Sequence, residues 1–362
     1  MGRVLRNVEL IIWDEVTMQS RFAFEAVHRL LCDMRSSDEL FGGVPVVLGG
    51  DWAQTLPVVV RGNRASVLAA CLRRSFIWRE LEVLTLRQNM RLQAGGVNAE
   101  FATWLTSLSR DPDMNGPIKL PEYLRRVTTA ADLCEAVFPR AELRNPNRDP
   151  DFFASRAILA VRNDQLPPHN DMLMDELPGE LKTYYADEEA LTETGEPAPE
   201  VTREFLQSLQ IPGLPPSFLK LKVGAPVMLL RNFRPNALCN GTRLVVTRLY
   251  RYAIEGRILA GDHKGEVHII PRIPISPIQG RLPWTVIRYQ IPVQPCFAIT
   301  VNKSQGQTLG VIGADLRVSA FAHSQLNVCF TRATNAYSIT TLLPEDADTT
   351  LNVNYEEVME GL

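Results

Sequence analysis

Two short apolar runs, residues 8–13 and 44–48, constrain the fold of this chain more than any other feature. The first ends in Asp14-Glu15, and the second runs into Gly49-Gly50-Asp51. Between them, residues 20–35 place apolar side chains at helical spacing. Short continuous apolar runs are typical of parallel strands covered on both faces. Strand, helix and strand in succession predict an α/β fold with a parallel sheet.

Length and composition narrow the class of protein. With 362 residues, the chain has room for two domains and a small third. Apolar residues make up 45% and charged residues 22%, as in ordinary globular proteins. No apolar run approaches the ~18 residues of a membrane span. The six cysteines form no C-x-x-C pair, which argues against a zinc site or a disulfide framework.

The second half of the chain changes character several times. Residues 157–161 predict a new buried strand, and the acidic stretch 183–204 predicts a solvated loop. Short strand-like runs separated by Gly and Pro follow from 221 to 293, then a strand at 296–301 and a helix at 324–332. We therefore expect a first domain at 1–110, a connector at 111–150, a second domain at 151–240 and 290–362, and a β insertion at 241–289.

Positive charge is concentrated in one segment. Residues 220–281 contain eleven Lys and Arg against three acidic residues, although the whole chain has a net charge of −3. A basic segment inside an acidic protein points weakly to nucleic acid. A solvated face of a small barrel is the competing interpretation.

The acidic pair after the first run has a chemical interpretation. An apolar strand that ends in Asp-Glu is the Walker B pattern of nucleoside triphosphatases, in which the Asp holds Mg²⁺ and the Glu polarises the attacking water. Asp14 and Glu15 match those two positions. Gln54, after the second strand, could sense a γ-phosphate, although a surface amide is the bland alternative.

Several longer stretches carry a family resemblance. In chain order they are LIIWDEVTMQ (10–19), FGGVPVVLGGDWAQTLPV (41–58), LRQNMRL (86–92), GAPVMLLRN (224–232), CNGTR (239–243), NKSQGQTL (302–309) and QLNVCFTRAT (325–334). Together they resemble the Pif-type DNA helicases of superfamily 1B, most closely the helicase module of Helitron-like elements. The resemblance implies two RecA-like domains of the P-loop NTPase type, the first of them incomplete, with a small SH3-like β-barrel inserted in the second.

The resemblance also implies roles for individual residues. It gives Asp14 to Mg²⁺, Glu15 to the hydrolytic water, and Asp51 and Gln54 to coupling of the γ-phosphate to domain movement. Arg91 and Arg332 match the two arginines that reach the triphosphate, and Gly306 and Gln307 match positions beside the nucleotide. The residues that would face DNA are Thr300, Asn302, Lys303 and Asn163.

Aromatic residues of the basic region are the other candidates for contact with DNA. Tyr250, Tyr252 and Phe233 could stack on bases, or they could be core residues of a small barrel. After the strand at 157–161, the pair Pro167-Pro168 is expected to disturb the helix that the family has there.

The implied activity is ATP-dependent 5′-to-3′ unwinding of DNA by a monomer, with ATP and Mg²⁺ as cofactors and single-stranded, duplex or forked DNA as partner. The implied processes are DNA repair, recombination and telomere maintenance, in the nucleus or, for a full-length protein, the mitochondrion.

One motif of such an enzyme does not occur. None of the six lysines follows a glycine, so the chain contains no G-x-x-x-x-G-K-[ST] P-loop. We expect a truncated product or a fragment of a longer reading frame that is inactive alone. The alternatives are an ATP-independent remnant that binds single-stranded nucleic acid, and an interaction subunit that completes its site with another chain.

Overall fold

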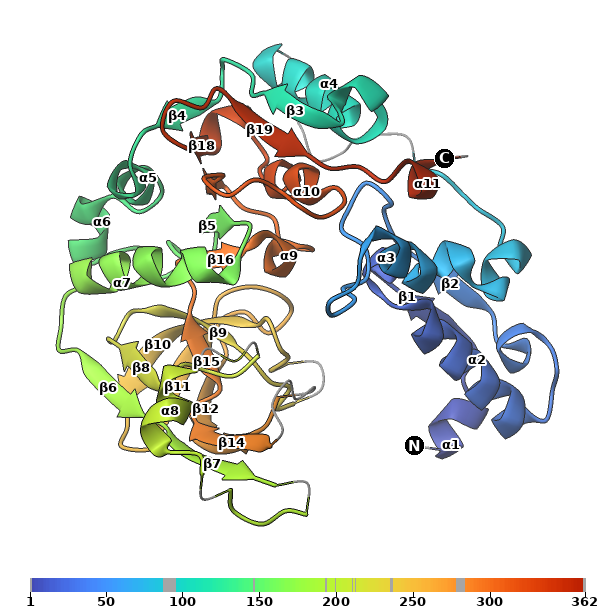
Figure 1. Ribbon diagram of the computed structural model, residues 1–362, viewed down its shortest axis with the longest axis horizontal. Coiled ribbons are helices and arrows are strands. Elements are labelled where there is room, and N and C mark those ends of the chain that lie inside the picture. Colours follow the sequence, from blue (N-terminus) through green and yellow to red (C-terminus); the bar gives the residue numbers. More distant parts are fainter. Residues whose placement is uncertain are drawn as a thin grey trace. The chain divides into compact units, whose positions relative to one another are not determined.

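The computed structural model describes residues 2–86, 96–145, 147–192, 194–198, 200–209, 211, 213–234, 237–277 and 284–360. The chain forms two compact units (Figure 1). Unit 1 comprises residues 1–126, 304–308 and 316–362, and unit 2 comprises residues 127–303 and 309–315. Each unit combines helices with strands, so the predicted α/β class is confirmed.

The helices and strands of unit 1 come from both ends of the chain. They are α1 (Gly2–Arg6), β1 (Ile11–Trp13), α2 (Arg21–Arg35), β2 (Val46–Leu48), α3 (Arg64–Ala70), α4 (Gly96–Arg110), β3 (Gly116–Lys119), β4 (Arg125–Val127), α10 (Gln325–Thr331), β18 (Ile339–Leu342), β19 (Thr349–Asn352) and α11 (Glu356–Met359). Short 3-10 helices lie at Val16–Met18, Leu40–Gly43, Leu72–Arg74, Phe76–Glu80, Pro112–Met114 and Ala336–Ser338.

Unit 2 is richer in strands. Its elements are α5 (Ala130–Val137), α6 (Arg140–Arg144), β5 (Arg156–Ala160), a 3-10 helix (Asn163–Gln165), α7 (Leu166–Glu176), β6 (Lys182–Tyr185), β7 (Asp187–Leu191), α8 (Arg203–Ser208), β8 (Phe218–Leu221), β9 (Pro226–Leu229), β10 (Arg243–Leu249), β11 (Ala253–Ile258), β12 (Val267–Pro271), β13 (Ile273–Ile275), β14 (Thr285–Gln290), β15 (Val293–Pro295), β16 (Ala298–Thr300), α9 (Val301–Ser304) and β17 (Val311–Asp315).

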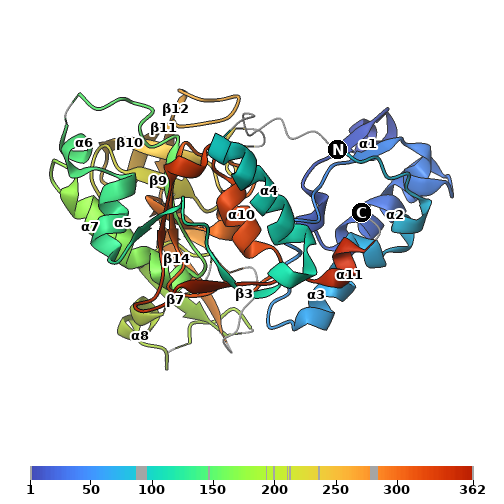
Figure 2. The ribbon, with the colours of Figure 1, turned by 90° about the horizontal axis from the view of Figure 1, so that it is seen from above.

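The strand pair predicted at the start of the chain is present in unit 1. β1 and β2 are parallel, with Ile11 opposite Val46 and Trp13 opposite Leu48. Phe24 and Leu31 of α2 are fully buried in the core beside this pair. Farther along, α10 packs on α4, where the ring centroids of Trp104 and Phe330 lie 5.2 Å apart (Figure 2).

Unit 2 contains a parallel and several antiparallel arrangements. β5 lies between β16 and β17 and is parallel to both. The order β12-β11-β10-β9-β15 forms an antiparallel sheet, and β13-β14-β7 forms another. Strand-like runs predicted between 221 and 293 are therefore strands. The domain boundaries and the SH3-like character of the insertion stay predictions.

Two local predictions for unit 2 are wrong. The acidic stretch predicted as a solvated loop contains β7, in which Glu188 and Ala190 face inward. The proline pair does not disturb α7, because Pro167 and Pro168 occupy its first turn. Main-chain N–H groups there have no partner within a helix, so proline removes nothing.

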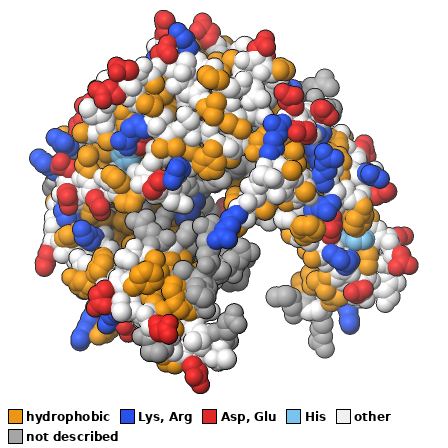
Figure 3. All heavy atoms as spheres, viewed as in Figure 1, with side chains coloured by type: hydrophobic (Ala, Val, Ile, Leu, Met, Phe, Trp, Pro, Cys, Tyr) orange, Lys and Arg blue, Asp and Glu red, His pale blue; other side chains and the backbone are white. Residues whose placement is uncertain are grey.

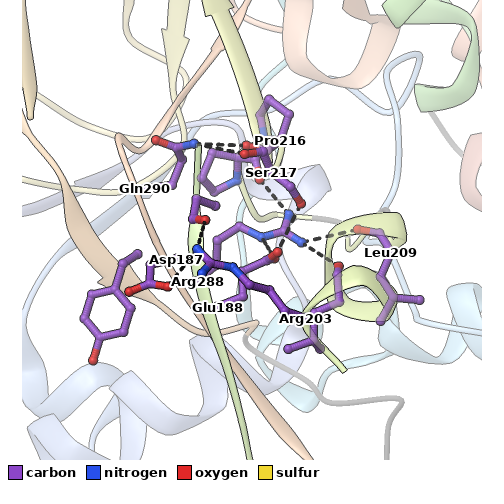
Figure 4. A network of polar contacts seen from close by, with 12 residues as sticks. Asp187, Glu188, Arg203, Leu209, Pro216, Ser217, Arg288 and Gln290 are labelled. Carbon is purple, nitrogen blue, oxygen red and sulfur yellow. Dashed lines mark hydrogen bonds and ion pairs between the residues drawn. The ribbon is translucent and has the colours of Figure 1, made fainter. Parts of the chain in front are cut away.

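A buried ion pair explains why an acidic strand belongs in the interior. The guanidinium of Arg288 on β14 donates from Nε to Glu188 Oε1 (Figure 4). Its Nη1 donates to the carbonyl of Pro215 at 2.8 Å. Arg288 is 1% exposed and Glu188 is 8% exposed. A second pair on the same strand, Asp187 with Arg203, lies at the surface at 3.0 Å.

These two pairs predict different costs of mutation. Glu188→Gln leaves a buried guanidinium without its counter-charge, so we expect the free energy of unfolding to fall by about 3 kcal/mol. Asp187→Asn, the neighbouring control, removes a surface pair worth at most about 1 kcal/mol. Urea denaturation of both variants measures the difference. Equal effects would show that Arg288 does not depend on Glu188.

Candidate nucleotide site and nucleic-acid edge

The acidic pair lies at the carboxyl end of β1. Two main-chain hydrogen bonds join this end to the end of β2: Gly49 N–H to the Trp13 carbonyl at 2.8 Å, and Val16 N–H to the Gly49 carbonyl at 3.0 Å. A Cβ on Gly49 would lie 3.0 Å from Asp14 Oδ1. The absence of a side chain at Gly49 therefore lets the two turns approach.

Glu15 has an unusual backbone. Its φ of 52° and ψ of 41° lie in the left-handed region, which costs a non-glycine residue of the order of 1 kcal/mol or more. The Glu15 N–H donates to Asp14 Oδ1 at 2.8 Å. Strain of this kind clusters at functional sites, where the surrounding structure holds it.

The turn after β2 presents a second acid and an amide. Asp51 Oδ1 accepts from the Ala53 N–H at 2.9 Å, and Asp51 Oδ2 accepts from Gln54 Nε2 at 3.3 Å. Gln54 Oε1 is buried, and within the described part of the chain it has no hydrogen-bond partner. An unpaired buried acceptor costs about 1–3 kcal/mol. A water or hydroxyl that donates to it would remove that cost.

Residues 304–308 bring a third segment to Glu15. Gln305 Nε2 donates to Glu15 Oε2 at 3.3 Å, and Gln305 Oε1 accepts from the hydroxyl of Thr55. Gly306 has a φ of 75°, and a Cβ there would lie 3.8 Å from Glu15 Oε1. The family resemblance pointed to Gly306 and Gln307, but not to Gln305 and Thr55. Their position inside two of the quoted stretches was the available signal.

Arg332 is buried below this segment. It is 2% exposed, and its guanidinium donates to the carbonyls of Val328 at 3.2 Å and Gln307 at 3.3 Å. Arg332 directly follows α10, and its hydrogen bond to the Gln307 carbonyl ties it to the segment 304–308. The other predicted arginine, Arg91, lies outside the described residues.

His323 supports the turn that carries Asp51 and Gln54. Its Nδ1 accepts from the Tyr355 N–H at 2.8 Å, and its Nε2 lies 2.8 Å from the Trp52 carbonyl, to which it donates as the neutral imidazole. Burial is the largest cause that lowers the pKa of His323, to about 4. His323 lies in none of the stretches that carry the resemblance.

The predicted DNA-facing residues lie in unit 2, after two neighbouring parallel strands. Thr300 ends β16 opposite Ala160, the last residue of β5. Asn302 and Lys303 follow Thr300 on α9, and Asn163 follows β5. These residues therefore share the carboxyl edge of one sheet. Asn163 is exposed, Thr300 is buried, and Asn302 and Lys303 are half-buried. Burial lowers the pKa of Lys303.

The three aromatic residues of the basic region differ in exposure. Tyr252 is 56% exposed and Tyr250 is 38% exposed, so these two are not core residues. Phe233 is half-buried. Across the face in Figure 3, Lys and Arg side chains are interspersed with Asp and Glu.

The described residues offer few ligands for a metal ion. No group of three or more His, Cys, Asp or Glu side chains among the described residues could hold an ion alone. Asp14 is exposed and offers one carboxylate. Mg²⁺ is commonly bound by one or two carboxylates together with phosphate and water oxygens, so Asp14 fits an ion shared with a nucleotide. No helix in the described ranges is long and apolar enough to cross a membrane.

Two family models match separate regions of the chain, and individual relatives match most of its length. The sequence model of the family described as PIF1-like helicase matches residues 1–111, and that of the DNA helicase Pif1 2B domain matches residues 204–249. Human ATP-dependent DNA helicase PIF1 is 26% identical over 334 residues, 90% of this chain and 45% of the relative. Yeast RRM3, from Saccharomyces cerevisiae, is 23% identical over 91% of this chain and 50% of the relative.

Solved structures agree with these matches. Pif1 helicase from Candida albicans superposes with a TM-score of 0.64 at 21% identity, over 99% of this chain and 77% of that one. Bacteroides Pif1 in complex with ADP-AlF3 and single-stranded DNA gives a TM-score of 0.66 at 21% identity, over 99% and 76%. The chain thus has the α/β fold of these proteins, and it spans about half the length of the curated relatives it matches.

The pH dependence of stability follows from the lowered pKa of His323. Between about pH 6.5 and pH 4 the unfolded state binds a proton that the folded state does not, so stability falls as the pH falls through that window. This residue adds a slope of up to about 1.4 kcal/mol per pH unit. Denaturation of the parent and His323→Gln at several pH values measures it. Identical slopes in parent and His323→Gln would contradict the assignment.

Proposed function

From the matches to the PIF1-like helicase family over residues 1–111 and to the Pif1 2B domain over residues 204–249, we propose that the chain is a Pif1-like helicase, with Glu15 and its neighbours as the hydrolytic half of an ATP-driven DNA helicase. The observation that carries the proposal is the Gln305 amide, which joins Glu15 to Thr55. Through it the segment at 304–308 contacts the acid proposed to act on water and the turn that carries Gln54. A change at the nucleotide therefore has a short route to residues 304–308.

The roles follow from the geometry. The Glu15 carboxylate accepts a proton from the attacking water, and the free Oε1 of Gln54 orients that water. Asp14 would hold Mg²⁺, which supplies charge stabilisation at the phosphates when bound. Asp51 fixes the Gln54 amide. Arg332, with Arg91, stabilises charge that develops in the transition state, and this role requires the Arg332 guanidinium to leave a main-chain carbonyl.

The proposed substrate is DNA. The relatives are named ATP-dependent DNA helicases, and one solved structure concerns unwinding of forked duplex DNA by two Pif1 helicases. In our proposal single-stranded DNA lies along the carboxyl edge of β5 and β16, where Thr300, Asn302, Lys303 and Asn163 face it. Movement is 5′-to-3′, the working unit is a monomer, and the place of action is the nucleus, with roles in repair, recombination and telomere maintenance.

A second function has one observation in its favour. Residues 1–362 contain no P-loop, the element whose amides and lysine grip phosphates. If no other segment supplies it, the chain is a remnant that binds single-stranded nucleic acid without ATP. The two functions differ in whether Glu15 matters.

Hydrolysis tests the role of Glu15. Residues 1–362 alone should turn over ATP far below ~1 s⁻¹, even with DNA. In a longer form that carries a P-loop, Glu15→Gln should lower turnover by about 10²-fold or more and keep ATP binding, because only the proton acceptor is lost. Glu9→Gln, an exposed acid before β1, is the matched control. Undiminished turnover in Glu15→Gln would remove Glu15 from the site.

Binding of DNA is testable with residues 1–362 themselves. We expect weak, sequence-independent binding of labelled single-stranded DNA that falls steeply with salt. Lys303→Ala should lower the affinity and reduce the slope of log K against log salt by about 0.7, the value for one phosphate contact. Arg140→Ala, which removes a charge already paired with Glu176, is the control. Fluorescence anisotropy at several salt concentrations measures both, and an unchanged slope in Lys303→Ala would refute the contact.

A further inference from the structure

A cavity of about 870 Å³ opens in unit 1 and shares no lining residue with the site around Glu15. Its lining comes from α4, the 3-10 helix at Pro112–Met114, the end of β3, the turn between β3 and β4, β4 itself and the residue before β19. Leu120 and Leu124 of the turn are 3% and 2% exposed and line it with apolar surface. Small-molecule sites commonly have volumes of about 300–1,000 Å³.

One wall is a half-buried indole. Trp104 on α4 is stacked on Phe101 at 6.0 Å, with an angle of 21° between the rings, and meets the edge of Phe330 at 5.2 Å. Both partners are fully buried. The indole is therefore held in place before any ligand binds, which lowers the entropic cost of ordering this side chain when a ligand stacks on it.

Charged side chains also line the cavity. Lys119, Arg125 and Arg126 line the cavity together with Glu122 and Asp348. Lys119 and Asp348 neutralise each other at 2.8 Å, and both side chains are more than 60% exposed. Arg125 and Arg126 remain against the single charge of Glu122, so the cavity has an excess of positive charge.

The two arginines differ in their existing contacts. Arg126 Nη2 donates to the Leu120 carbonyl at 2.8 Å, which fixes its guanidinium at the wall. The structure gives the Arg125 guanidinium no hydrogen bond or ion pair to any described residue. A planar guanidinium without a partner is suited to bidentate contact with phosphate.

We propose that this cavity binds a nucleoside phosphate, with the phosphate at Arg125 and Arg126 and the base on Trp104. Stacking on an aromatic side chain tolerates every base, and the cavity is large enough for one nucleotide. The nucleotide comes either free from solution or as part of a nucleic-acid strand. The proposal is independent of ATP hydrolysis at Glu15, because no residue is shared.

Titration with thymidine 5′-monophosphate, followed by tryptophan fluorescence, tests the site in residues 1–362. We expect saturable quenching that disappears in Trp104→Phe and is weaker with thymidine, which lacks the phosphate. A tetrathymidylate titration distinguishes the two sources: tighter binding than the mononucleotide indicates a strand, and equal or weaker binding indicates a free nucleotide.

Substitutions of charged lining residues should change the affinity for the nucleotide in opposite directions. Arg125→Gln should weaken binding about tenfold, the loss expected for one charge-assisted hydrogen bond. Glu122→Gln should strengthen binding, because it removes the opposing charge. Arg79→Gln, at an exposed arginine outside the cavity, is the matched control and should change nothing. Circular dichroism checks that each variant is folded. Quenching that is absent in the parent, survives Trp104→Phe, or is equal in Arg125→Gln and Glu122→Gln would overturn the proposal.

Discussion

The amide of Gln305 is the interaction on which the arrangement around Glu15 depends. Both of its ends are used, since Nε2 donates to Glu15 and Oε1 accepts from Thr55. An amide offers a donor and an acceptor at fixed separation, and neither Glu nor Leu can reproduce the pair. Gln305 lies 290 positions from Glu15 and 250 positions from Thr55 in the sequence. A small motion of residues 304–308 therefore changes the surroundings of the Glu15 carboxylate and of the turn after β2 together.

Glu15 is held in position by its surroundings more than by its own preference. Its left-handed backbone is unfavourable, and the hydrogen bonds between the ends of β1 and β2 compensate for it. Gly49 permits this because a side chain there would crowd Asp14. The carboxylate therefore projects from a turn with few alternative conformations. The general-base role that we propose for Glu15 requires such preorganisation, because the carboxylate must be oriented before a substrate binds.

Features that depend on local pattern are predictable from this sequence, whereas contacts between distant residues are not. Apolar runs placed the parallel strands and the acids at their ends, since chain order alone determines which turn follows a strand. Gln305 could not be predicted as the partner of Glu15, because that contact exists only after folding. The same limit explains why β7 was predicted as a solvated loop. Glu188 is acidic, and only the fold shows that Arg288, 100 positions away, neutralises it in the interior.

The outer side of the β1–β2 pair bears on the proposed function. Ile12 is 73% exposed and Val47 is 55% exposed, although parallel strands are almost always covered on both faces. Each Å² of apolar surface removed from water is worth about 25 cal/mol, so a segment that covers this face is stabilised by it. The proposed ATP site separately needs main-chain amides and a lysine that grip phosphates. A segment that covers this face and also supplies those amides would meet both needs of the proposed helicase.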